Sequence, residues 1–175
     1  MQSKNYGKVF WITGLSGSGK SSIGEKLKVL LNKKNEKTLI IHGDDIRNIF
    51  KFKYYSKKKR LSLAKSYSDF CKLINQQGIN IIFTTVGLFN EVFKYNRKNL
   101  KNYTEIFIQT KIEKLKKHKS KIFYKKKTKN VWGLDLKPEY PRKPDIIINN
   151  NFKKSINDLA KIIYNEIKKN NSKKK

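Results

Sequence analysis

Short apolar runs alternate with longer amphipathic stretches along most of the chain. The runs are rich in branched and aromatic residues, as in VFWIT near the amino terminus. They cover residues 8–13, 38–42, 79–84, 105–109 and 145–149. Runs of this kind are typical of strands that are covered on both faces, as in a parallel sheet. The pattern therefore predicts five parallel strands.

The amphipathic stretches between the runs carry helix start and stop signals. Ser56 is a candidate cap for a helix over residues 57–76, with Gly78 just past its end, and Ser155 opens another over 155–169. Further helices are predicted over 21–32, 46–50, 91–100 and 111–117. This alternation predicts an α/β fold, a five-stranded parallel sheet with helices on both faces. Ligands of such sheets bind beyond the carboxyl ends of the strands.

One segment does not fit the alternation. Residues 119–143 are basic, contain Pro138 and Pro141, and form a stretch too long for an ordinary connection. We predict that they form a basic lid, with a disordered insertion as the alternative. Residues 1–170, with this lid included, are expected to form a single domain, followed by a disordered basic tail over 171–175.

The charge and cysteine content change this picture little. The formal net charge of +29 is almost all lysine, and the lysines are spread over every segment. This spread favours a solvated surface over a dedicated nucleic-acid site. The single cysteine, Cys71, excludes an internal disulfide and fits a reducing cytoplasm. We expect a cytoplasmic protein with no signal peptide and no membrane span.

A phosphate-binding loop follows the first predicted strand. The stretch GLSGSGKS, residues 14–21, fits the pattern G-x-x-x-x-G-K-[ST] at every required position. Its backbone N–H groups can surround phosphate at a helix start, Lys20 can reach the β- and γ-phosphates, and Ser21 can bind Mg²⁺. The motif alone predicts ATP or GTP as ligand. The residues expected to hold it are Gly14, Leu15, Ser16, Gly17, Ser18, Gly19, Lys20, Ser21 and Ser22.

The next polar cluster, HGDDIR at residues 42–47, ends the second predicted strand. We expect that strand near the first, which places Asp44 opposite the γ-phosphate as a base and Mg²⁺ ligand. Arg47 could then clamp an anionic acceptor. The alternative is that Asp44 or Asp45 only caps the short helix that follows. His42 is interpreted as a strand-end residue rather than a catalyst.

With these residues in view, the chain resembles the adenylylsulfate kinases. The resemblance rests on FWITGLSGSGKSSIGEKL, GDDIR and YSKKKR, continues through GINIIFTTVGLF and NVWGLD, and runs from about residue 9 to 149. It implies a P-loop kinase that uses Mg-ATP to phosphorylate a ribose 3′-hydroxyl. A branch linked to capsule-sugar loci, which includes cytidine diphosphoramidate kinases, is also similar.

The resemblance also implies site residues. Asp44 matches the family's base and metal partner, and Lys125 matches a lid lysine near the phosphates. The positions expected to bind the acceptor are Arg47, Tyr55, Arg60, Lys125, Val131 and Trp132.

Four positions depart from the family pattern. His42 replaces an aspartate, Leu63 an asparagine, and Gly87 a serine. Val131 replaces a lid phenylalanine for which the adjacent Trp132 could substitute.

The leading hypothesis is therefore transfer of the ATP γ-phosphoryl group to adenylyl sulfate, which gives 3′-phosphoadenylyl sulfate and ADP. One alternative is the same chemistry on cytidine diphosphoramidate for capsule modification. Others are a nucleic-acid-binding protein or an inactive nucleotide-binding relative. The expected partner is a small-molecule nucleotide acceptor, with no dedicated nucleic-acid binding and no membrane; a homodimer is left open.

Overall fold

The computed structural model describes residues 5–34, 36–52, 56–117 and 131–172. Within these ranges the strands form one parallel sheet in the order β2-β3-β1-β4-β5. Their bounds are Val9–Thr13 for β1, Thr38–His42 for β2, Asn80–Thr85 for β3, Tyr103–Gln109 for β4 and Ile146–Asn149 for β5. The predicted α/β fold with a five-stranded parallel sheet is confirmed, because the buried, branched runs all became strands.

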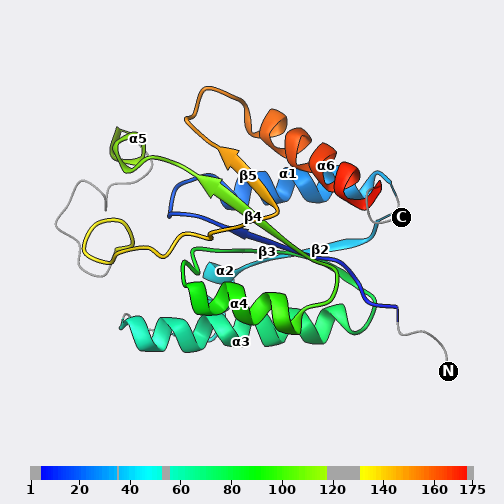
Figure 1. Cartoon of the computed structure of the whole chain (residues 1–175), viewed down its shortest axis with the longest axis horizontal. Helices are drawn as coiled ribbons and strands as arrows, with labels where there is room; N and C mark the ends of the chain where they lie inside the picture. Colours follow the sequence, from blue (N-terminus) through cyan, green and yellow to red (C-terminus); the bar gives the residue numbers. More distant parts are fainter. Residues whose placement is uncertain (1–4, 35, 53–55, 118–130, 173–175) are drawn as a thin grey trace.

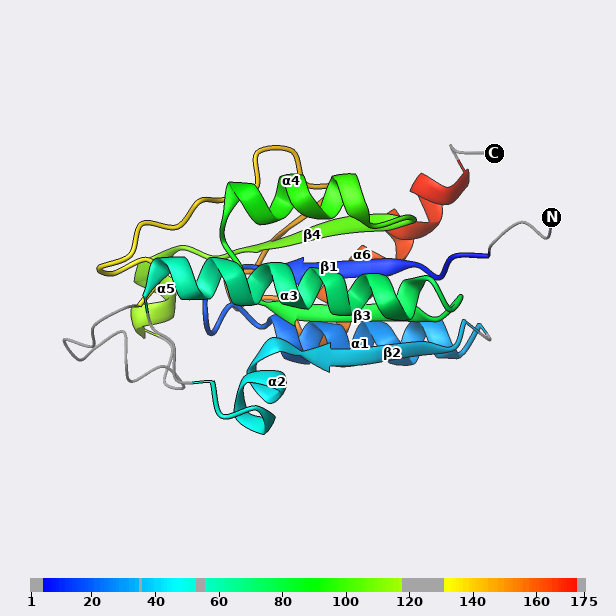
Figure 2. The ribbon, with the colours of Figure 1, turned by 90° about the horizontal axis from the view of Figure 1, so that it is seen from below.

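Helices cover both faces of this sheet (Figures 1 and 2). The helices α1, Lys20–Asn32, and α6, Ile156–Ser172, pack on one face, and α3, Lys57–Asn75, and α4, Asn90–Asn99, cover the other. The short helices are α2, Gly43–Ile49, and α5, Ile112–Lys117. The hydroxyl of Ser56 caps α3 as predicted, since it accepts from the backbone N–H of Lys59 at 3.4 Å.

The core lies in two layers on either side of the sheet. The layer under α3 and α4 is aromatic, and Trp11 stacks on Phe83 with ring centroids 5.0 Å apart. The layer under α1 and α6 is aliphatic, with Ile23, Leu27 and other branched residues. Burial of the central strands β1 and β3 on both faces makes the sheet a rigid base for the groups at its carboxyl ends.

The strand order corrects one expectation. We expected the strand that ends in His42 to lie near β1, but β3 lies between β1 and β2. His42 pairs in register with Thr84, and Thr84 pairs with Ile12. The carboxyl ends of all three strands still share one edge of the sheet, so the residues after β2 remain close to the loop after β1.

The predicted lid is described only from residue 131 onward, and its first part, 119–130, lies outside the described residues. Residues 131–140 lie on the side toward which the arrows of β4 and β5 point (Figure 1). Three contacts fix this part. Trp132 packs edge-on against Phe89, with centroids 5.0 Å apart, and Glu139 accepts from the Lys57 ammonium and from the N–H of Asn90, each at 2.9 Å. The described half is therefore packed on the domain.

The predicted disordered tail is wrong at its start. The helix α6 continues to Ser172, so residues 171 and 172 are helical, and only 173–175 lie outside the described residues. The ion pair between Lys169 and Glu166, at 2.9 Å, supports this last part of the helix. Among the described residues, no helix is long and apolar enough to cross a membrane.

Candidate active site

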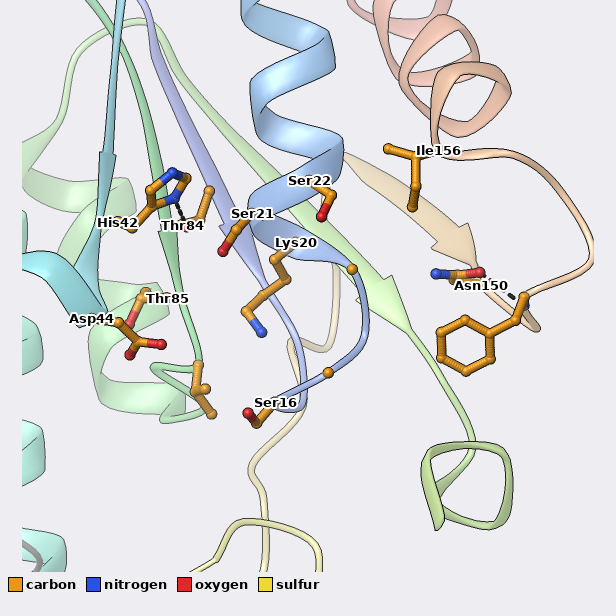
Figure 3. A pocket seen from close by; sticks show the side chains of 14 residues that line it. Ser16, Lys20, Ser21, Ser22, His42, Asp44, Thr84, Thr85, Asn150 and Ile156 are labelled. Carbon is orange, nitrogen blue, oxygen red and sulfur yellow. Dashed lines mark hydrogen bonds between the residues drawn. The ribbon is translucent and has the colours of Figure 1, made fainter. Parts of the chain in front are cut away.

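A pocket of about 430 Å³ opens at the carboxyl ends of β1, β2 and β3 (Figure 3). We call it the phosphate pocket. Its walls come from the phosphate loop, the starts of α1 and α2, the end of β3 and the segment after β5. The lining residues are Ser16, Gly17, Gly19, Lys20, Ser21, Ser22, His42, Asp44, Thr84, Thr85, Val86, Asn150, Phe152 and Ile156.

The curvature of the phosphate loop depends on its glycines. Gly19 is the N-cap of α1 and has φ 92°, a left-handed conformation that side chains other than glycine rarely adopt. A Cβ at Gly14 would lie 2.4 Å from the carbonyl oxygen of Ile108, so only glycine fits against β4 there. This geometry leaves the first N–H groups of α1 at the pocket, where they form a natural site for an anion.

The loop residues divide into pocket-facing and structural ones. Six of the nine predicted residues, Ser16, Gly17, Gly19, Lys20, Ser21 and Ser22, line the pocket. Leu15 is instead buried in the aromatic core, and Ser18 is fully buried. The carbonyl of Ser18 accepts from the amide of Asn150 at 3.0 Å, which joins the loop to the segment after β5.

Lys20 supplies the positive charge of the pocket. Its side chain points into the pocket, although the residue is only 8% exposed (Figure 3). Its ammonium group donates to the carbonyl of Leu15 at 2.8 Å, a bond within the loop itself. An ammonium group has three N–H donors, so Lys20 can keep this bond and still donate to phosphate.

Asp44 lies across the pocket from Lys20, in the first turn of α2 (Figure 3). Its side chain is 71% exposed and accepts a hydrogen bond from the guanidinium of Arg47. The alternative that Asp44 or Asp45 caps this helix is wrong, because α2 begins earlier than predicted. Its N-cap is His42, and no side chain makes a capping hydrogen bond there. Both Asp44 and Asp45 lie inside the first turn, where carboxylates interact favourably with the helix dipole.

The start of α2 is held by α3. The hydroxyl of Tyr67 donates to the carbonyl of Gly43 at 2.9 Å, and burial raises the pKa of this tyrosine to about 12. A Cβ at Gly43 would lie 3.2 Å from both the Tyr67 ring and the Thr85 hydroxyl. Glycine therefore lets α2 begin directly against α3 and β3, which sets the position of Asp44.

Of the acceptor residues expected from the resemblance, the four that the structure describes do not line this pocket. Arg47 pairs with Asp44 and does not line the pocket, and neither does Arg60 at the start of α3. Trp132 is 6% exposed and belongs to the aromatic core, with Val131 packed against that core, so their predicted role toward the acceptor stays a prediction. The predicted positions Tyr55 and Lys125 lie outside the described residues.

Several pocket residues were not singled out from the sequence. Thr84, Thr85 and Val86 follow the apolar part of β3, and Asn150 and Phe152 follow β5. Their only sequence signal is their place at the carboxyl ends of predicted strands, where ligands of parallel sheets bind. His42 was interpreted as a strand-end residue, yet its side chain lines the pocket.

The parallel sheet, the glycine loop at the start of α1 and the lysine in the pocket together define a phosphotransferase of the P-loop class. The family model described as adenylylsulphate kinase matches residues 6–149. The chain belongs to this family.

Relatives within the family carry two different names. The cytidine diphosphoramidate kinase of Campylobacter jejuni is 34% identical over 168 residues, which cover 94% of this chain and 98% of that protein. The adenylyl-sulfate kinase of Clostridium acetobutylicum is 34% identical over 151 residues, 83% of this chain and 76% of that protein.

Solved structures agree on the fold. The Mycobacterium tuberculosis APS kinase CysC, in complex with AMPPNP and APS, superposes with a TM-score of 0.84 at 23% identity. The alignment covers 93% of this chain and 98% of that chain. At this identity the likeness concerns the fold alone.

Proposed function

We propose that this kinase transfers the γ-phosphoryl group of ATP to the ribose 3′-hydroxyl of cytidine diphosphoramidate. The observation that carries the chemistry is the pair of Lys20 and Asp44, which lie on opposite sides of one phosphate pocket at a helix start. The choice of acceptor is supported by the end-to-end match to the C. jejuni kinase.

The donor triphosphate would occupy the phosphate loop. Backbone N–H groups at the start of α1 and the Lys20 ammonium would neutralise the β- and γ-phosphates. This group of donors is rigid, because Gly14 is fitted against β4 and Asn150 fixes the Ser18 carbonyl. A rigid set of donors needs no reorganisation when negative charge moves toward the leaving ADP.

In the transfer step the ribose hydroxyl oxygen forms a bond to the γ-phosphorus. The bond from that phosphorus to the β–γ bridging oxygen breaks, and ADP leaves. Asp44 would orient the hydroxyl and accept its proton. Arg47 already pairs with this carboxylate, and a bound acceptor phosphate could compete for the same guanidinium.

The donor set of the pocket fits Mg²⁺. The Ser21 hydroxyl and the Asp44 carboxylate are hard oxygen ligands on the same pocket, the type that this cation prefers. Mg²⁺ would supply charge neutralisation between the phosphates. We therefore propose Ser21 and Asp44 as its protein partners.

Adenylyl sulfate is the second candidate acceptor. It is favoured by the family model over residues 6–149 and by the adenylyl-sulfate kinases among the relatives. The two acceptors differ in base and in the group on the distal end of the phosphate chain, so the same pocket chemistry serves either one.

The test is ADP release by the full chain with Mg-ATP and each acceptor separately. We expect kcat/KM to be at least about tenfold higher with cytidine diphosphoramidate, a difference of ~1.4 kcal/mol in transition-state binding. A preference of similar size for adenylyl sulfate would overturn the acceptor assignment. Lys20→Ala is the control: it should remove almost all transfer, and unchanged turnover in this variant would overturn the assigned donor site.

A further inference from the structure

His42 ends β2 with its ring held between two other elements. Its Nδ1 is 2.7 Å from the Thr84 hydroxyl oxygen on β3, and its Nε2 is 3.0 Å from a Glu25 carboxylate oxygen on α1. Thr84 is 3% exposed and, like His42, lines the phosphate pocket (Figure 3). The three side chains form a continuous hydrogen-bonded chain from the surface of α1 to the pocket wall.

The sheet register and a glycine create this arrangement. His42 and Thr84 are register partners, so their side chains leave the same face of the sheet. A Cβ at Gly24 of α1 would lie 3.0 Å from the Thr84 methyl group, so glycine allows α1 to come close to β3. The next residue, Glu25, is thereby placed beside the His42 ring.

When the imidazole ring is neutral, the chemistry of the three groups fixes the direction of each hydrogen bond. A carboxylate only accepts, so the Nε2 atom that faces Glu25 must carry the proton. In the neutral ring Nδ1 then has a lone pair and accepts from the hydroxyl of Thr84. A hydroxyl has a single proton, so the Thr84 oxygen is left with only lone pairs to offer to the pocket.

We propose that His42 is a positioning residue: held by Glu25 in its Nε2–H form, it fixes the Thr84 hydroxyl as a hydrogen-bond acceptor on the wall of the phosphate pocket. The group that donates a hydrogen bond to the Thr84 oxygen is either a water bound to the phosphate-associated cation or the ribose hydroxyl of the acceptor. The effect on turnover rests on the proposed kinase function; the state of the ring does not.

The first test observes the ring directly. The chain has two histidines, His42 and His118, so ¹⁵N-histidine NMR with a His118→Asn variant assigns the His42 signals. At about pH 8.5, where a free imidazole is neutral, we expect the proton on Nε2 and an unprotonated Nδ1. Glu25→Ala should abolish this preference, and Glu25→Gln should keep it, because the amide oxygen still accepts. A proton on Nδ1 in the wild-type chain would overturn the proposal.

The second test measures turnover. Glu25→Ala and Thr84→Val should each lower kcat about tenfold, the size expected for one hydrogen bond, and Thr84→Ser should restore it. The double variant should be no slower than Thr84→Val alone, because both substitutions interrupt one chain. Independent effects, about a hundredfold in the double variant, would contradict this coupling. Glu166→Ala, which removes an exposed pair with Lys169, is the matched control and should leave kcat unchanged.

The two sources of the donor give different kinetics in Thr84→Val. A higher Mg²⁺ requirement would identify a cation-bound water, and a higher KM for the acceptor would identify the ribose hydroxyl. Turnover equal to wild type would overturn the role of Thr84. If the wild-type chain proves inactive with every acceptor, the proposed function fails, but the NMR measurement still decides the state of His42.

Discussion

At the scale of single residues, two neighbouring aspartates have different surroundings. Asp44 lines the phosphate pocket and pairs with Arg47, whereas Asp45 is exposed and does not line it. Successive residues of a helix point about 100° apart, so one position decides which carboxylate can meet a substrate.

Asp44→Asn tests this difference. We expect kcat to fall at least about a hundredfold, as for loss of a general base, while the Kd for ATP changes less than about threefold. Asp45→Asn makes the same substitution at the next residue, and its kcat should stay within about twofold of wild type. Single-turnover kinetics and nucleotide titration separate the two effects. Equal losses of kcat and ATP affinity in Asp44→Asn would contradict a catalytic role.

At the scale of elements, the short helix α2 depends on α3 for its position. A seven-residue helix has little stability of its own, so its start must be held by tertiary contacts. The hydrogen bond from Tyr67 to the Gly43 carbonyl and the tilted packing of the Tyr67 ring against Phe83, with centroids 5.1 Å apart, provide them. Asp44 follows Gly43 directly, so α3 positions the carboxylate through α2.

Tyr67→Phe removes only the hydroxyl of this contact. We expect the free energy of unfolding to fall by about 1 kcal/mol and kcat to fall several-fold, with ATP affinity unchanged. The matched control is Tyr95→Phe, which removes an exposed hydroxyl bonded to Asp69 at 2.7 Å. Denaturant unfolding and steady-state kinetics give the two values. Unchanged kcat in Tyr67→Phe would show that Asp44 is positioned without this hydrogen bond.

At the scale of the whole molecule, a buried carboxylate lies far along β4 from the active site. Glu105 is 1% exposed, and its carboxylate lies 3.5 Å from the guanidinium of Arg97. The backbone N–H of Glu105 donates to the carboxylate of Asp145 at 2.7 Å. Burial raises the pKa of Glu105 from its ordinary value of 4.5 to about 7, and Arg97 opposes the shift. The cluster joins α4, β4 and the entry to β5.

This shift predicts a pH dependence of stability. The folded chain binds the Glu105 proton more tightly than the unfolded chain does. The stabilisation that protonated Glu105 gives the fold is therefore complete below about pH 4.5 and is lost as pH rises to about 7. Relative to Glu105→Gln, the wild-type free energy of unfolding should fall by ~2–3 kcal/mol between pH 5 and pH 8. Denaturant unfolding at several pH values measures this, with the exposed Glu113→Gln as control. A difference independent of pH would contradict the shift.

The sequence predicted the fold well because its signals are local. The strand bounds agree to within a residue or two, and Ser56 caps α3, since apolar periodicity and caps involve neighbours along the chain. The phosphate loop was also readable, because its glycines and Lys20 are needed at fixed spacing for a single turn. The loop alone could not show that Leu15 and Ser18 turn inward.

By itself, then, the sequence determined the sheet, the helices and the loop at the start of α1, each of which depends on residues close in the chain. Only the tertiary structure decided that β3 lies between β1 and β2, that Trp132 packs in the core, and that His42 lies between Glu25 and Thr84. These features join segments far apart in sequence. They follow from how whole elements pack, which no local pattern records.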